Sequence, residues 1–212
     1  MNLHRLGEAG RCGPGATPPI RLLGLGGVVG PLAFVGAWVL AGAATDGYSA
    51  VDRAISDLAA VGASTRVAMT IGFVVFGGGL IAFGLALRAT LDGRAWTAAV
   101  ATGSCTIVVA ATPLGGWSGD PVHAIFAGLG YATLVALPLL AAGPFAALAH
   151  TGWALMSRLT AAASALCLTA SALGPAHGVW QRLGLTLGDV WIVVTALALV
   201  AAVGPFRGEL RT

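Results

Sequence analysis

The sequence predicts an all-α membrane protein, a polytopic bundle of six transmembrane helices with both termini in the cytoplasm. Of its 212 residues, 57% are hydrophobic and 9% are charged, whereas soluble domains carry about 25% charged residues. The apolar residues form six runs close to the roughly 20 residues that a membrane-crossing helix needs. Together with the distribution of the arginines, these two observations exclude an ordinary soluble domain.

The eleven basic residues are all arginine, and they divide unequally between the two ends of the predicted helices. Three lie on the side opposite the termini, and these are Arg53, Arg66 and Arg182. The other eight lie on the side of the termini: Arg5, Arg11, Arg21, Arg88, Arg94, Arg158, Arg207 and Arg211. Because basic residues are enriched in cytoplasmic connectors, this excess predicts cytoplasmic termini in the cell membrane. The net charge of +3 thus reflects topology, so we expect membrane lipid and no nucleic acid as a partner.

The two ends of the chain are predicted to be tails. Residues 1–20 mix Gly, Pro and charged residues without an apolar period, which predicts a disordered cytoplasmic tail. Residues 21–206 form the transmembrane domain, and residues 207–212 form a second cytoplasmic tail. A signal peptide is the alternative for the first forty or so residues, but the apolar run at 22–44 exceeds the 7–15 residues of a signal core.

The first three spans are predicted at residues 22–44, 67–87 and 95–111. Between the first two lies Thr45–Arg66, a long polar interruption that carries three of the six aspartates. The triplet Gly77–Gly79 falls inside the second span, and small residues there predict close contact with another helix.

The last three spans are predicted at residues 121–142, 153–173 and 186–203. Proline-containing sequences separate them, because proline ends or interrupts a helix. These sequences are Thr112-Pro113 after the third span, Gly143-Pro144 after the fourth, Gly174-Pro175 after the fifth and Gly204-Pro205 after the sixth. Residues 176–185 are predicted to form a second polar connector.

Acidic, histidine and arginine side chains fall in the connectors that this topology places outside. Two imidazoles with one or two carboxylates suit a zinc site with an open coordination position, or metal-free general acid–base catalysis. The candidate catalytic or metal-binding residues are Asp57, Asp120, His123 and His177. The candidate substrate-binding residues are Arg53, Ser56, Trp180 and Arg182.

Helix capping is the alternative explanation for the acids. Ser56 or Asp57 can cap a short helix formed by the residues that follow. Asp120 stands immediately before Pro121, which is typical of an N-cap followed by proline at the first helical position. Asp189 follows Thr186 at capping-box spacing.

The histidines are harder to explain by capping. His123 would lie in the first turn of the fourth helix, where a histidine without a partner is unfavourable. We therefore expect an acid or a polar connector group in contact with it, and Asp57 is the preferred partner. His177, alone in its connector, can instead be simply solvated.

These residues carry a resemblance to the bacterial and archaeal six-helix membrane proteins catalogued as domain of unknown function 998, over about residues 22–205. The resemblance implies the fold but no activity. The Thr45–Arg66 loop is also distantly similar to the DRAM and Frag-like eukaryotic membrane proteins, some linked to remodelling of lipid anchors. The residues that carry the family resemblance are Tyr48-Ser49, Ile55-Ser56-Asp57-Leu58, Asp120, His123 and His177.

Two functions follow as hypotheses. One is an enzyme that acts on a lipid or lipid-linked head group at the outer leaflet. The alternative is a non-catalytic scaffold, a lipid-binding protein or a small transporter. Transport is the weakest of these, because no inverted repeat marks a binding site at the middle of the membrane.

The predicted topology can be tested by cysteine labelling with a membrane-impermeant reagent. Cysteine introduced at Ser49 or Ser118 should be labelled from outside the cell, and cysteine at Gly93 should not. The reverse pattern would contradict cytoplasmic termini.

Overall fold

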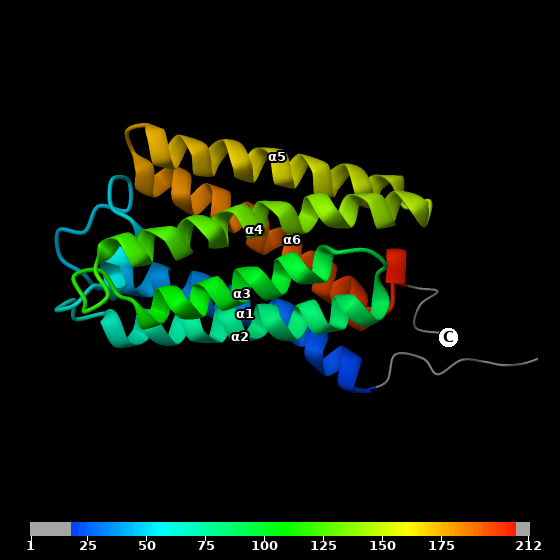
Figure 1. Cartoon of the computed structure of the whole chain (residues 1–212), viewed down its shortest axis with the longest axis horizontal. Helices are drawn as coiled ribbons and strands as arrows, with labels where there is room; N and C mark the ends of the chain where they lie inside the picture. Colours follow the sequence, from blue (N-terminus) through cyan, green and yellow to red (C-terminus); the bar gives the residue numbers. More distant parts are fainter. Residues whose placement is uncertain (1–17, 207–212) are drawn as a thin grey trace, which may run out of the picture.

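The computed structural model describes residues 18–206. In that part of the chain it has six α-helices and two short 3₁₀ helices, and no strand (Figure 1). The all-helical prediction is therefore confirmed. The elements are α1 (Pro18–Ala43), η1 (Ile55–Ala59), α2 (Arg66–Thr90), α3 (Ala95–Ala111), α4 (Asp120–Ala147), α5 (Thr151–Leu173), α6 (His177–Ala201) and η2 (Gly204–Phe206).

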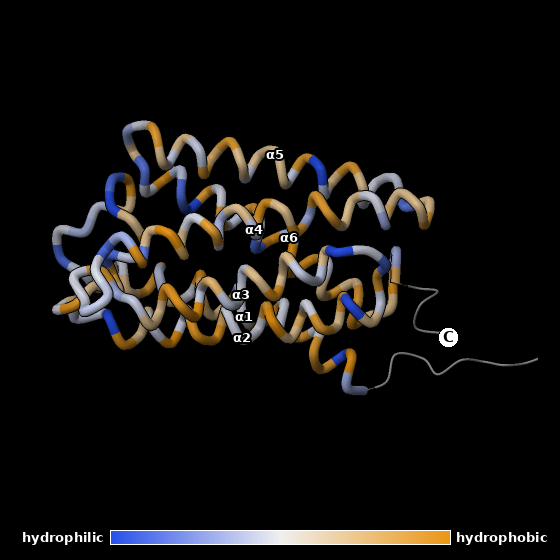
Figure 2. The backbone as a smooth tube through the Cα atoms, in the orientation of Figure 1, coloured by the Kyte–Doolittle hydropathy of each residue, from blue (hydrophilic) through white to orange (hydrophobic). Residues whose placement is uncertain are grey.

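Five of these helices, α1, α2, α4, α5 and α6, are long and apolar enough to cross a membrane. The remaining helix, α3, has 17 residues, or about 25 Å at 1.5 Å per residue, slightly less than the roughly 30 Å of the hydrocarbon layer. Figure 2 shows hydrophobic residues along the helices and hydrophilic residues concentrated toward the ends of the bundle. The chain is accordingly a multi-pass membrane protein.

Each helix packs against the next one in the chain, and α6 returns to pack against α1 and α4. Helices α1, α2, α3, α4 and α6 thus surround a common interior, while α5 lies outside against α4 and α6. The connectors 44–65, 112–119 and 174–176 meet at one end of the bundle, which we call the connector end. Helix α1 begins and α6 finishes at the opposite end (Figure 1).

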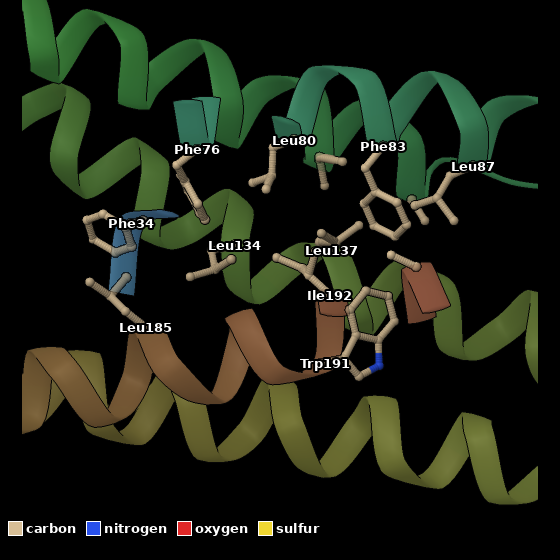
Figure 3. Packing of buried hydrophobic residues seen from close by; sticks show 14 of the residues in the cluster. Phe34, Phe76, Leu80, Phe83, Leu87, Leu134, Leu137, Leu185, Trp191 and Ile192 are labelled. Atoms are coloured by element: carbon tan, nitrogen blue, oxygen red, sulfur yellow. The ribbon is translucent and has the colours of Figure 1, made fainter. Parts of the chain in front are cut away.

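The hydrophobic core runs along this interior. Phe34 packs against Phe76 with ring centroids 5.1 Å apart, and side chains from α4 and α6 meet them from the other side (Figure 3). The buried Trp191 indole N–H donates to the Ser157 hydroxyl at 2.9 Å. Its one polar atom is therefore satisfied, as a buried tryptophan requires.

Glycines bring α2 against two neighbouring helices. A Cβ atom added at Gly79 would lie 2.5 Å from the Gly26 carbonyl oxygen of α1, and one at Gly77 would lie 2.7 Å from the Gly103 carbonyl oxygen of α3. A Cβ at Gly78 would meet no atom within 4 Å. The predicted close contact is confirmed for the outer two glycines of the triplet, because only they let the backbones approach.

Two predicted helix ends are wrong. Helix α4 does not stop at Gly143-Pro144 but continues through Pro138 and Pro144 to Ala147. Proline is tolerated there because neighbouring helices hold the membrane helix together around the missing backbone hydrogen bond. Helix α6 begins at His177 and not near Thr186, because the polar residues of its first two turns find partners in the adjacent connector.

The N-terminal helix also begins earlier than expected. Helix α1 includes residues 18–20, which the sequence assigned to a disordered tail. The rest of that predicted tail, residues 1–17, and the predicted tail at 207–212 lie outside the described residues.

The glycine contacts predict a graded effect on stability. Gly77→Ala and Gly79→Ala should each destabilise the protein by about 1–3 kcal/mol, because the added methyl group meets backbone atoms of a neighbouring helix. Gly78→Ala is the matched control and should leave stability unchanged. Thermal unfolding in detergent measures the difference, and equal stability of all three variants would exclude these contacts as stabilising.

Candidate functional site

The centre of the connector end is the short helix η1. Its Ile55 and Leu58 side chains are buried against α1 and α2, and residues three apart share one face of a 3₁₀ helix. This anchoring holds Ser56, which is 8% exposed, at the top of the bundle interior. Hydrophobic burial of its neighbours therefore fixes the position of this serine.

Ser56 contacts the buried ring of His123. The two ring nitrogens of His123 have different partners: Nε2 lies 2.9 Å from the Ser56 Oγ, and Nδ1 lies 2.7 Å from the Thr112 carbonyl oxygen. A carbonyl oxygen can only accept, so the proton of neutral His123 is on Nδ1. The lone pair of Nε2 then accepts a hydrogen bond from the Ser56 hydroxyl. This is the geometry in which a histidine can act as a base toward a serine.

Gln181 of α6 extends this network. Its Oε1 accepts from the Ile55 backbone N–H at 2.9 Å, which fixes the orientation of the amide. Its Nε2 donates to the Tyr131 hydroxyl at 2.5 Å. One N–H of Gln181 and the hydroxyl proton of Tyr131 have no acceptor among residues 18–206, so both remain available as donors.

Ser56, Gln181 and Tyr131 line a cavity of about 50 Å³ in the bundle interior, which we call the chamber. Most of its wall is apolar and comes from α1, α2, α3, α4 and α6. Five of the lining side chains are polar, and they come from η1, α3, α4 and α6. The lining residues other than those three are Phe34, Ile55, Phe73, Phe76, Thr102, Thr106, Val109, Phe126, Ala127, Gly130, Leu134 and Leu185.

Arg182 attaches α6 to the connector before η1. It is buried, and no carboxylate pairs with it among the described residues. Its guanidinium instead donates to main-chain oxygens and lies over the Trp38 ring, 5.3 Å from the centroid. The hydrogen-bond acceptors are the carbonyl oxygens of Ala50 (2.9 Å), Arg53 (3.0 Å) and Gly178 (2.9 Å) and the hydroxyl of Tyr48. The two Nη atoms of Arg182 thus hold the connector, while its buried Nε has no hydrogen-bond partner among the described residues.

Tyr48 completes this attachment. Burial raises the pKa of its phenol above the usual value, although the nearby Arg182 acts in the opposite direction. The neutral hydroxyl donates to the Ala54 carbonyl oxygen at 2.8 Å, directly before η1.

The predicted pairing of Asp57 with His123 is wrong, because the neighbouring residue Ser56 takes that place. Asp57 accepts instead from the Arg53 side chain at 3.1 Å. The predicted cap on a short helix is also wrong, since the N-cap of η1 is Ala54. The broader expectation, that a polar connector group contacts His123, is confirmed.

The predicted role of Asp120 as the N-cap of the fourth helix is also wrong. The N-cap of α4 is Gly119, and Asp120 is the first helical residue. Its carboxylate accepts from the Gly115 N–H at 2.7 Å and so stabilises the turn of the connector.

His177 and Trp180 lie on the first turn of α6 and not in a connector. The His177 carbonyl accepts from the Ser171 hydroxyl at 2.9 Å, and Trp180 is exposed. No group of three or more His, Cys, Asp or Glu residues that could hold a metal ion occurs within residues 18–206. The expected zinc-ligand set of Asp57, Asp120, His123 and His177 is therefore not assembled.

Three members of the site were not predicted. Gln181 was placed in a connector and Tyr131 in a span, and only the three-dimensional packing brings them together. Thr112 contributes a backbone carbonyl, which has no signature in the side-chain sequence. Asp189 was also misassigned, because it lies in the middle of α6, far from the helix start that a capping box requires.

A bundle of long apolar helices whose polar side chains meet at one end defines a multi-pass membrane protein. The chain belongs to the family described as protein of unknown function (DUF998), whose model matches residues 28–198. This match extends from α1 into α6 and includes Ser56, His123 and Gln181. No curated protein and no solved structure is significantly similar to the chain.

The arginine attachment predicts a local effect. Arg182→Leu should raise hydrogen exchange of the amides at residues 50–58 by about tenfold or more, because hydrogen bonds from a charged group contribute about 1.5–3 kcal/mol. Mass spectrometry of the exchanged peptides measures the change. Arg88→Leu is the control, since Arg88 packs on Trp96 with its guanidinium 4.9 Å from the ring but lies at the other end of the bundle. Equal exchange in both variants would refute the role of Arg182.

Proposed function

We propose that this protein is a membrane enzyme that acts on a lipid or lipid-linked acyl group, with Ser56 as the nucleophile and His123 as its general base. The observation that carries the proposal is the bond of 2.9 Å between Ser56 Oγ and His123 Nε2 at the wall of the chamber. A serine hydroxyl is a weak nucleophile alone and needs such an adjacent base.

The proposed reaction is acyl transfer to Ser56. His123 Nε2 takes the Ser56 proton while Oγ bonds to the carbonyl carbon of an ester. The bond from that carbon to the leaving oxygen then breaks, and the leaving alcohol takes the proton from Nε2. Water, activated by the same nitrogen, hydrolyses the acyl-serine and restores the hydroxyl.

The third member of this arrangement is the Thr112 carbonyl oxygen, which holds the imidazole in the correct tautomer at 2.7 Å. In serine proteases a carboxylate does this work. A carbonyl orients the ring equally well but carries only a partial negative charge. We therefore expect His123 to take the serine proton more slowly than the histidine of an enzyme with a complete triad.

Two hydrogen-bond donors that have no acceptor among the described residues are available to stabilise the negative charge that develops on the substrate carbonyl oxygen. The Tyr131 hydroxyl and the second N–H of Gln181 share the chamber wall with Ser56. Donors fixed before the reaction stabilise an oxyanion more than water does, because they need no reorganisation.

The surroundings of Ser56 favour a lipid substrate. The chamber wall carries four phenylalanine rings, Phe34, Phe73, Phe76 and Phe126, and these apolar side chains suit an acyl chain. The proposed chemistry needs only Ser56 and His123, so Asp57, Asp120 and His177 have no direct part in it.

A non-catalytic scaffold is the alternative that the same bonds allow. His123 joins the connector after α3 to η1, and this contact alone stabilises the connector end. The two functions differ in one respect, since only a catalytic serine reacts with an electrophile faster than other serines.

A long-chain alkyl fluorophosphonate distinguishes them. Purified protein in lipid nanodiscs should be labelled at Ser56, as located by peptide mass spectrometry. Ser56→Ala should abolish labelling, and His123→Ala should slow it by about 100- to 10,000-fold, the usual contribution of a general base.

Ser49→Ala is the matched control. Ser49 lies in the same connector and donates to the Asp52 carboxylate at 2.7 Å, but it is only partly buried and has no histidine partner among residues 18–206. Its variant should be labelled like the unmodified protein. If folded protein is not labelled at Ser56, or is labelled equally fast without His123, the enzyme proposal fails and the scaffold remains.

A further inference from the structure

Asp189 is the one acidic residue among the described residues that lies deep inside a membrane-crossing helix. It is the thirteenth of the 25 residues of α6, about 18 Å along the axis from His177. Its side chain is 3% exposed, and neither carboxylate oxygen has a hydrogen-bond partner within residues 18–206. The proposed reaction at Ser56 does not use it.

An acid at this depth needs an explanation. An unpaired carboxylate in hydrocarbon is so unfavourable that the group is carried as the neutral acid. Even the neutral acid leaves one donor and one acceptor unsatisfied, which destabilises the monomer relative to an apolar residue of similar shape. Acidic residues in membrane helices usually face a cavity or a partner.

Asp189 lines a groove between α1 and α6, with a volume of about 220 Å³, which we call the α1–α6 groove. The groove faces the bilayer, since Leu32 is 62% exposed and Val190 is 55% exposed. Its remaining walls are Pro31 and Val35 of α1 and Thr186, Val193 and Val194 of α6. The carboxyl oxygens themselves are buried, so a bond across the groove requires the side chain to rotate outward about the Cα–Cβ bond.

Depth limits what can occupy this groove. Lipid head groups lie at the membrane surface, about 15 Å from the middle of a hydrocarbon layer roughly 30 Å thick. They do not reach a residue in the middle of α6. A polar partner at this level therefore comes from another transmembrane helix, where polar side chains form bonds between helices.

We propose that the α1–α6 groove is the contact surface for a second copy of this chain, and that the two Asp189 carboxyl groups pair across it. A two-fold axis along the membrane normal brings each Asp189 to its counterpart at the same depth. A neutral carboxyl is both donor and acceptor. Two of them therefore form two reciprocal O–H···O bonds, and each of the four oxygens gains a partner.

The valine and leucine side chains around Asp189 fit the same arrangement. Val190, Val194 and Leu32 lie on the exposed walls of the groove, where the same surface of a second copy can pack against them. In a membrane such packing and the polar bond act together, because no hydrophobic force draws helices together.

The test measures association of the whole protein in lipid vesicles by single-molecule photobleaching. The unmodified protein should form dimers, and Asp189→Leu should weaken them by about tenfold, the effect of losing bonds worth roughly 1–2 kcal/mol in a membrane. The variant is expected to fold, since an apolar residue leaves no buried polar group unpaired. A monomeric unmodified protein, or equal dimerisation of the variant, would overturn the proposal.

Cysteine cross-linking locates the contact. In protein whose own cysteines, Cys12, Cys105 and Cys167, are replaced by alanine, Val190→Cys should form a disulfide between copies. Ile125→Cys is the control, because Ile125 is exposed on α4 outside the groove. Cross-linking at both positions or at neither would exclude the groove as the dimer contact.

Discussion

The connector end depends on the attachment of α6 to the main chain of residues 50–55. Gln181 accepts from the Ile55 N–H, and Arg182 donates to the carbonyl oxygens of Ala50 and Arg53. A polar connector beside an apolar bundle needs such partners, since its backbone groups are otherwise buried without hydrogen bonds. Gln181 and Arg182 therefore hold η1 in position, and the position of η1 brings Ser56 to His123. Loss of these hydrogen bonds would move Ser56 away from His123 even though both residues are unchanged.

The close approach of the helices complements this attachment. Glycine pairs such as Gly26–Gly79 and Gly77–Gly103 draw α1, α2 and α3 together along their length. The chamber lies where aromatic side chains of α1, α2 and α4 meet Ser56 and Gln181. Small residues thus allow the helices to pack closely, whereas large aromatic side chains surround the chamber beneath η1.

Much of this fold could be predicted from composition and spacing. The six helices and the contact of Gly77 and Gly79 follow from apolar runs and small residues, and the importance of Ser56 and His123 follows from polar residues in an apolar chain.

The errors share one physical cause. Polar composition was taken as a sign of a connector, but Gln181 and Arg182 are helical because they bond to a segment more than a hundred residues away in the chain. Pro144 was taken as a helix end, although the packing of neighbouring helices maintains α4 around it. Asp189 was interpreted through local spacing, and only the position of the helix start showed that no cap was present.

The Thr112 carbonyl has a consequence for how the site is encoded. Because Pro113 disfavours helical backbone at the preceding residue, α3 ends at Ala111. The Gly116 N–H donates to the Pro113 carbonyl oxygen at 3.0 Å and not to that of Thr112, so the Thr112 carbonyl is free to accept from His123. Replacing the Thr112 side chain leaves the acceptor in place, so a survey of substitutions would identify Ser56 and His123 and pass over the third member. The residue type that matters for this carbonyl is therefore Pro113, whose ring restricts the backbone of Thr112. Pro113 thus contributes to the site through its effect on the backbone.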